Sequence, residues 1–106
     1  MPKYLIEAKY RGEAMKGLLK EGGSGRRRAV DELLASVGGK VESFYFAFGD
    51  TDAYVVVEVP DNVTAAAVAL TVGASGAIKL KTTVLMTPEE VDQATKKSPS
   101  YRAPGG

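Results

Sequence analysis

Two kinds of periodicity alternate along this chain, and their order is the feature that most restricts its fold. Residues 3–10 and 77–86 alternate between two faces, which is the period of a β-strand. The full order is strand, helical region, two strands, helix and strand, at residues 3–10, 12–37, 41–48, 53–59, 63–72 and 77–86. The order β-α-β-β-α-β predicts an α+β protein with a ferredoxin-like arrangement, in which a four-stranded antiparallel sheet carries both helices on one face.

The first helical region is predicted to break at Gly22-Gly23-Ser24-Gly25. Each glycine costs a helix roughly 1 kcal/mol relative to alanine, so two helices are favoured, with Ser24 capping the second. The apolar stripes before and after the break are about three helical turns apart, so a single kinked helix would bury the same face. Gly38-Gly39 ends the helix in either case.

A hairpin is predicted around the loop Gly49-Asp50-Thr51-Asp52. Pairing across this loop sets Phe48 opposite Ala53, Phe46 opposite Val55 and Phe44 opposite Val57. We therefore expect the core face of the hairpin to consist of Phe44, Phe46, Phe48, Val55, Val57 and Val59.

The opposite face of the predicted sheet mixes apolar and charged residues. Its members are Leu5, Tyr45, Ala47, Tyr54, Val56 and Leu85, interleaved with Glu7, Lys9, Glu58, Lys79 and Lys81. This face is too apolar for a solvated surface. The sequence therefore predicts a homo-oligomer in which a second copy covers it, an assembly of the α/β barrel type.

The C-terminal end has its own signals. Thr87-Pro88-Glu89-Glu90 is a capping box with proline at the first helical position, and it predicts a short helix to about Lys97. The proline- and glycine-containing residues 98–106 are expected to form a flexible tail. The chain is therefore interpreted as one domain, residues 1–97, and a tail.

Composition excludes several kinds of chemistry. The 106 residues include no cysteine, histidine or tryptophan, so we assign no catalytic residue, no metal ligand and no cofactor. A net charge of +1 gives no reason to expect nucleic acid or a membrane as partner. The charged N-terminus and the lack of an apolar run of about 20 residues favour a cytoplasmic protein.

Four segments resemble the GYD domain family. They are the runs from Lys16 to Arg27, from Phe44 to Gly49, from Val59 to Asn62 and from Lys81 to Leu85. The resemblance covers roughly residues 1–95 and implies a small bacterial or archaeal protein, related in outline to dimeric α/β barrel proteins. The family is named for a Gly-Tyr-Asp motif in the hairpin turn, where this chain has Gly49-Asp50-Thr51-Asp52. Thr51 stands where the family's tyrosine would be expected.

The segment from Lys20 to Arg28 is the first candidate site. A glycine-rich turn at a helix start presents free backbone N–H groups, and arginines can grip a phosphate or carboxylate. The anion would contact Gly22, Gly23, Ser24, Gly25, Arg26 and Arg27. The simpler interpretation is a flexible connection beside solvated arginines.

Two further groups of residues are candidates. The turn motif Gly49, Asp50, Asp52 and Tyr54 could supply acid–base or cation-binding groups, although Asp and Gly are also what turns require. Lys79 and Lys81 share a sheet face with Glu7 and Glu58, which suggests either a polar pocket inside an oligomer or simple ion pairs.

Two functions follow from these patterns. The favoured one is a non-catalytic oligomeric module that binds a small anionic ligand or a protein partner. The alternative is a cofactor-free enzyme of the dimeric α/β barrel type, acting on a small aromatic or enolic substrate. A buried tyrosine or carboxylate lining an enclosed pocket between sheet and helices would reverse this preference.

Overall fold

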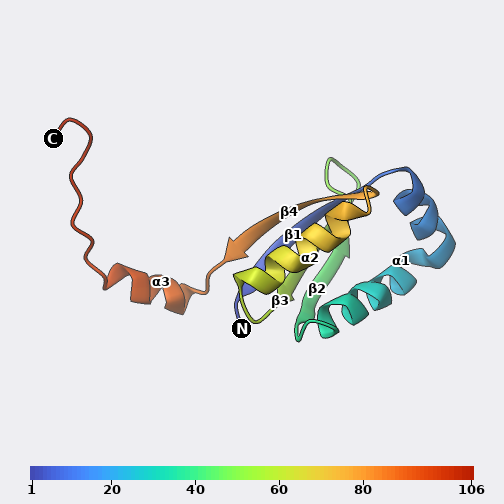
Figure 1. Cartoon of the computed structure of the whole chain (residues 1–106), viewed down its shortest axis with the longest axis horizontal. Helices are drawn as coiled ribbons and strands as arrows, with labels where there is room; N and C mark the ends of the chain where they lie inside the picture. The colour runs from blue at the N-terminus through green and yellow to red at the C-terminus, as the bar shows by residue number, and fades with distance from the viewer.

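The computed structural model describes all of residues 1–106 (Figure 1). Its elements are β1 (Lys3–Tyr10), α1 (Gly12–Ala35), β2 (Lys40–Phe46), β3 (Ala53–Glu58), α2 (Asn62–Ala74), β4 (Ile78–Leu85) and α3 (Pro88–Thr95). The predicted α+β class and element order are confirmed. The last helix ends at Thr95, slightly before the predicted Lys97.

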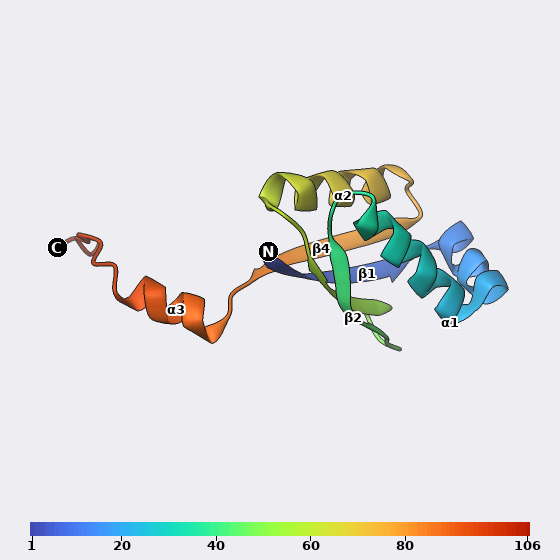
Figure 2. The ribbon, with the colours of Figure 1, turned by 90° about the horizontal axis from the view of Figure 1, so that it is seen from below.

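All four strands form one antiparallel sheet in the order β2-β3-β1-β4. Helix α1 packs along β2 and α2 along β4, and both lie on the same face of the sheet (Figure 2). The other face carries no helix. The sheet is therefore sealed on one side only.

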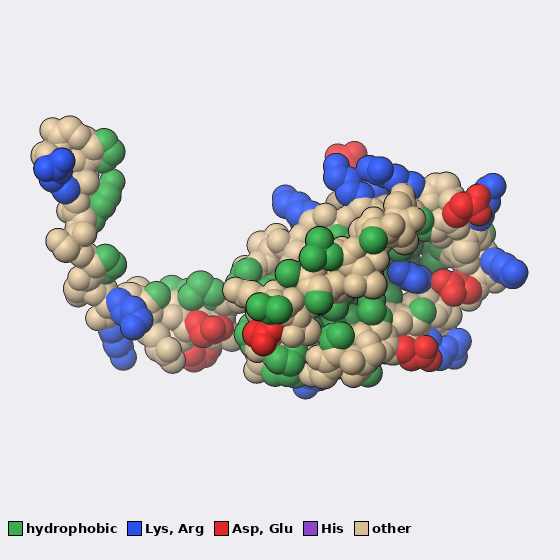
Figure 3. All heavy atoms as spheres, viewed as in Figure 1, with side chains coloured by type: hydrophobic (Ala, Val, Ile, Leu, Met, Phe, Trp, Pro, Cys, Tyr) green, Lys and Arg blue, Asp and Glu red, His purple; other side chains and the backbone are tan.

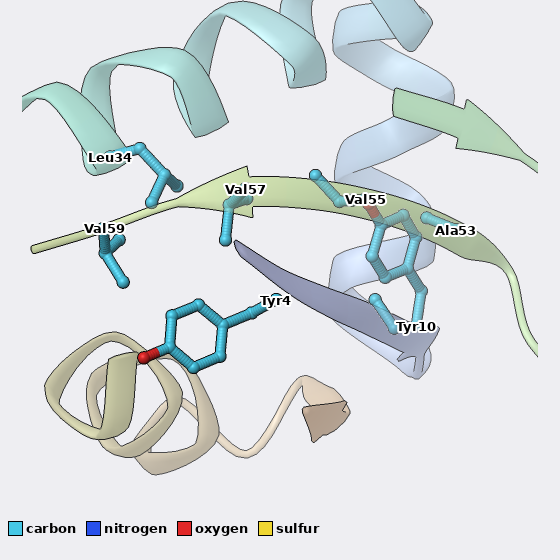
Figure 4. Packing of buried hydrophobic residues seen from close by; sticks show 8 residues of the cluster. Tyr4, Tyr10, Leu34, Ala53, Val55, Val57 and Val59 are labelled. Atoms are coloured by element: carbon cyan, nitrogen blue, oxygen red, sulfur yellow. The ribbon is translucent and has the colours of Figure 1, made fainter. Parts of the chain in front are cut away.

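The core forms where the two central strands meet the helices (Figure 4). Alternate residues of β1 and β3 point toward α1 and α2, because successive side chains of a strand lie on opposite faces. The buried residues are Tyr4, Ala8, Tyr10, Leu34, Ala53, Val55, Val57, Val59 and Val68. Central strands are covered by neighbours on both edges, which explains why β1 and β3 supply most of this set.

Two neighbouring residues at the start of α2 have different roles. Asp61 is the N-cap, and its Oδ1 accepts a hydrogen bond from the Thr64 backbone N–H at 2.8 Å. Hydrogen bonds from the hydroxyl and backbone of Thr64 lower the pKa of Asp61. Asn62 instead accepts a hydrogen bond from the buried hydroxyl of Tyr4. Tyr4 therefore ties β1 to the first turn of α2.

Helix α1 consists of two helical segments that meet at Gly22, so the predicted break is present but takes one residue rather than a loop. Only Gly22 leaves the helical conformation, with φ at 76° and ψ at 172°. The predicted cap at Ser24 is wrong: this residue lies inside the helix, exposed, and its hydroxyl makes no hydrogen bond. Gly23 follows the kink beside β2, where an added Cβ would lie 3.1 Å from the Phe46 ring. Gly22 therefore allows the kink, and Gly23 allows the helix to lie close to the sheet.

The predicted hairpin register is wrong by two residues. Phe46 pairs with Ala53 and Phe44 with Val55, and a bulge interrupts the ladder near Ser43. The loop is longer than predicted, and it closes through a hydrogen bond from the Ala47 N–H to the Asp52 carbonyl at 2.9 Å. Phe48 is consequently fully exposed in the loop instead of lying in the core. A shift of two residues keeps Phe44, Phe46, Val55 and Val57 on their predicted face, and the bulge brings Val41 to the same face.

The C-terminal segment is an arm that leaves the domain (Figures 1 and 2). Its capping box is confirmed, since Thr87 Oγ1 accepts from the Glu90 N–H at 3.1 Å and Glu90 Oε1 from the Thr87 N–H at 2.9 Å. Every residue from Pro88 to Gly106 is nevertheless exposed. The radius of gyration, 17.0 Å, exceeds the roughly 13 Å expected for a compact domain of this length.

Gly39 provides a direct test of this packing. A Cβ at Gly39 would lie 2.5 Å from the Glu58 carbonyl oxygen and 2.8 Å from Val59 Cγ1, so β2 or β3 would have to move. We expect Gly39→Ala to lower the free energy of unfolding by about 1–3 kcal/mol, as measured by urea denaturation. Gly49→Ala is the matched control, because its Cβ would enter open space. Equal stability of the two variants would contradict the described contact of β2 with β3.

Candidate functional site

A hollow lies between the sheet and the two helices that cover it. Side chains from β1, β2, β3, β4, α1 and α2 form its walls, and thirteen of its fourteen lining residues are hydrophobic. Its volume is about 40 Å³, and it opens to solvent at one side. The hollow is thus a small, mostly apolar space between the sheet and the helices.

Arg26 is the one charged residue in the lining of this hollow. Its guanidinium carbon lies 5.8 Å from the centre of the Tyr10 ring, within the range of a cation–π contact. Its Nε atom is buried and has no hydrogen-bond acceptor. Tyr10 itself is only 7% exposed, so the guanidinium meets an aromatic wall rather than water on that side.

An unpartnered buried donor is unusual, because leaving such a group unsatisfied costs about 1–3 kcal/mol and more for a charged group. A carboxylate is the natural partner, since arginine presents its N–H donors in a fork that matches the two carboxylate oxygens. The attraction is stronger beside apolar walls than in water. The chemistry of the lining thus suits a small anion whose remaining atoms are apolar.

The predicted anion-binding segment contains Arg26, but its residues do not converge. Arg27 is turned toward Asp31 on the helix surface, with Nε and Oδ1 at 3.1 Å. Ser24 and Arg28 are exposed. Gly22 forms the kink and Gly23 the contact with Phe46. Only Arg26 faces the hollow.

The sequence analysis did not predict that Arg26 faces the interior, although the spacing of the apolar residues that follow it indicates this. Val30, Leu33 and Leu34 follow Arg26 at intervals of four, seven and eight residues, and they form the inward stripe of the helix. A cation on that stripe is a departure from the amphipathic pattern. No local signal pointed to Tyr10, which reaches Arg26 only through the packing of β1 against α1.

The turn motif has a structural role at Asp52. Asp52 Oδ2 accepts a hydrogen bond from the Tyr10 backbone N–H at 2.9 Å, and the Asp52 N–H donates to the Ala8 carbonyl at 2.9 Å. These bonds fasten the hairpin loop to the end of β1. Asp50 is exposed elsewhere in the loop, and a Cβ added at Gly49 would meet only open space. Tyr54 lies on the open sheet face opposite Tyr45. The four residues do not form one site.

A second, polar hollow of about 180 Å³ lies at one end of the open sheet face. Its charged lining residues are Glu7, Lys9, Asp50, Lys79 and Lys81. Lys81 Nζ lies 4.0 Å from Glu7 Oε2, and the Thr51 hydroxyl donates to Glu7 Oε1 at 3.5 Å. Three lysines face two carboxylates here, so this end of the sheet carries a positive charge. We call it the lysine end.

At the opposite end of the open face, Glu58 pairs with Lys3 at 3.5 Å and Lys40 at 3.3 Å rather than with Lys79 or Lys81. Burial alone would raise the pKa of Glu58, but the hydrogen bonds and charges of Lys40 and Lys3 outweigh it and lower the pKa. The pairs therefore stabilise the fold above the ordinary glutamate pKa, and this contribution is lost as pH falls through the lower folded-state value. A hydrogen bond to Glu42 raises the pKa of Lys3.

Comparison with known proteins identifies a family. The model of the GYD domain matches residues 4–95 of the chain. No curated protein and no solved structure matches the sequence. None of the helices combines the length and apolar content that a bilayer crossing requires.

The two aspartates of the turn motif are distinguishable by stability. Asp52→Ala removes the acceptor of the Tyr10 N–H, and we expect it to lower the free energy of unfolding by about 1–3 kcal/mol. Asp50→Ala removes an exposed side chain without a hydrogen bond in the structure and should change stability by less than about 0.5 kcal/mol. Urea denaturation measures both. A larger loss for Asp50→Ala than for Asp52→Ala would contradict the structural role of Asp52.

Proposed function

Since the chain belongs to the GYD domain family, we propose that this member is a non-catalytic module that binds a small carboxylate with an apolar body. The observation that carries the proposal is the buried Nε of Arg26, which has no acceptor within an otherwise apolar hollow. We infer a carboxylate from the chemistry of the Arg26 guanidinium. We infer an apolar body for the ligand from the hydrophobic residues that line the hollow.

The position of Arg26 supports this proposal over a purely structural role. An arginine with a purely structural role would be expected to pair with a carboxylate, as Arg27 does with Asp31. Arg26 has no such partner, and burying a charge without one is costly. A bound carboxylate would supply the missing acceptor. The apolar part of the same ligand would move out of water and into contact with the apolar walls of the hollow. Both contributions favour the complex.

The assembly belongs to the same proposal. The strand order β2-β3-β1-β4, with both helices on one face, supports a ferredoxin-like arrangement. The uncovered face presents Tyr45 and Tyr54, which are 71% and 41% exposed, beside Leu5 and Val56. We propose that a second copy covers this face, as in dimeric α/β barrel proteins. The Arg26 hollow lies on the opposite side of the sheet, so association leaves it accessible.

One observation favours the enzymatic alternative. Tyr10 is a buried tyrosine that lines the hollow beside Arg26, and a phenol can transfer a proton to or from a bound substrate. No carboxylate or lysine lines the same hollow, so Tyr10 would be the sole proton-transfer group there. Binding needs only Arg26 and the walls, which is why we place it first. Turnover of an enolic or aromatic acid that Tyr10→Phe abolishes would favour the enzyme.

Thermal melting tests the binding proposal. Acetate, butyrate and benzoate vary the apolar body at constant charge, and a ligand at 100 times its dissociation constant stabilises by about 2.7 kcal/mol, a shift of several degrees. We expect butyrate or benzoate to raise the melting temperature more than acetate does, and the shift to shrink with added salt. Arg26→Gln should abolish it.

Arg27→Gln is the matched control, because it removes the neighbouring guanidinium from the helix surface and should leave the shift intact. Phosphate separates the two candidate anion sites. A phosphate shift that depends on Arg27 would instead favour the glycine-rich segment. If no carboxylate moves the wild-type melt, or if Arg26→Gln responds like the wild type, the proposed ligand class is wrong.

A further inference from the structure

The C-terminal arm, residues 86–106, has no packing surface within its own chain. Met86, Val91 and Tyr101 are 55%, 46% and 74% exposed, and no residue of α3 is buried. Figure 3 shows hydrophobic side chains along the surface of the arm. The arm leaves β4 at Leu85 and extends beyond the end of the sheet (Figure 1). Its apolar side chains are therefore presented to whatever lies beyond that end.

A helix as short as α3 requires tertiary contacts. Isolated helices below about 12–15 residues are marginal in water, and α3 has 8. Its capping box contributes on the order of 1 kcal/mol, which does not offset the cost of nucleation. A persistent α3 therefore implies a surface on which Val91 and its neighbours pack.

The charges of α3 indicate which surface this is. Glu89 and Asp92 lie three residues apart, so they share one side of the helix about 5–6 Å from each other. Lys79 and Lys81 lie two residues apart on the open face of β4, about 7 Å from each other. The lysine end carries excess positive charge and borders the apolar part of the open face. It therefore matches the acidic side of α3 in sign and spacing.

The lysine end of the same chain is poorly placed to receive α3. Lys79 and Lys81 lie toward the start of β4, whereas the arm leaves from its other end and α3 begins after only Met86 and Thr87. Reaching them would require a sharp reversal at Met86 and Thr87 that lays the arm over its own open face. A second copy removes this difficulty. A twofold axis in the plane between two facing sheets, perpendicular to the strands, places the lysine end of each copy beside the arm of the other.

We propose that α3 of each copy docks on the lysine end of the partner's open sheet face, with Glu89 and Asp92 opposite Lys79 and Lys81. This inference rests on the proposed association through the open face and adds an exchanged arm to it. The exchange of arms also selects the orientation of the twofold axis. An axis parallel to the strands would instead bring the two acidic arms together.

Cysteine cross-linking tests the docking directly, because the chain contains no cysteine of its own. Asp92→Cys and Lys81→Cys are prepared as separate full-length proteins, mixed, and treated with a short bis-maleimide. We expect a covalent heterodimer from this mixture. Lys16→Cys replaces Lys81→Cys in the control mixture; its side chain is also exposed, on α1, and should give little product. Equal yields from the two mixtures would overturn the proposal.

Charge reversal provides an independent measurement. Lys79→Glu with Lys81→Glu should weaken the dimer about tenfold in sedimentation experiments, since two exposed ion pairs are lost. Adding Glu89→Lys and Asp92→Lys to the same chain should restore much of the affinity. A quadruple variant that associates no better than the Lys79, Lys81 pair variant would overturn the assigned contact.

The outcomes separate this inference from the association on which it rests. A wild-type monomer at micromolar concentration would overturn both. A dimer that Val56→Lys dissociates, but that gives no cross-link between Cys-substituted positions 92 and 81, would leave the sheet-face association and overturn arm docking. A cross-link within a single chain carrying both cysteines, without one between chains, would also overturn it. None of these outcomes depends on Arg26 or a ligand.

Discussion

The burial of alternate residues of β1 and β3 beneath α1 and α2 is the interaction on which the rest of the structure depends. Tyr4 of β1, Val57 of β3 and Val59, which follows β3, lie in one cluster with Leu34 of α1, each at most 2% exposed. At roughly 1.5–3 kcal/mol for each large apolar side chain removed from water, these contacts dominate the stability of so small a domain. They also seal one face of the sheet and leave the other without cover. Both proposed sites follow from this asymmetry.

Arg26 is the point at which the local pattern conflicts with the packing. Its helix presents an apolar stripe to the sheet, and Arg26, half-buried on that stripe, has its Nε shielded from water without gaining a carboxylate. Natural sequences agree with their folds at most positions, and the exceptions concentrate at functional sites. The kink at Gly22 turns α1 immediately before Arg26, and Gly23 permits close approach to Phe46. The approach of α1 to the sheet therefore helps to define the hollow that Arg26 lines.

The sequence predicted the features that are set locally. The order of elements, the end of α1 at Gly38-Gly39 and the capping box at Thr87 all depend on neighbouring residues, and all three are present. The hairpin register was not predictable, because a shift of two residues preserves the face of every side chain. The exposure of Phe48 and the hydrogen bonds of Asp52 depend on that shift. The contact of Arg26 with Tyr10 is likewise tertiary, since it joins residues of α1 and β1.

The most direct test of the account is to observe the Arg26 guanidinium itself. The Nε–H groups of arginine give separate signals in ¹H–¹⁵N spectra, and Arg26→Gln identifies which one belongs to Arg26. On titration with benzoate, the Arg26 signal should move to saturation while those of Arg27 and Arg28 remain in place. An unmoved Arg26 signal at saturating benzoate, or equal movement of all three, would contradict a carboxylate site in the hollow.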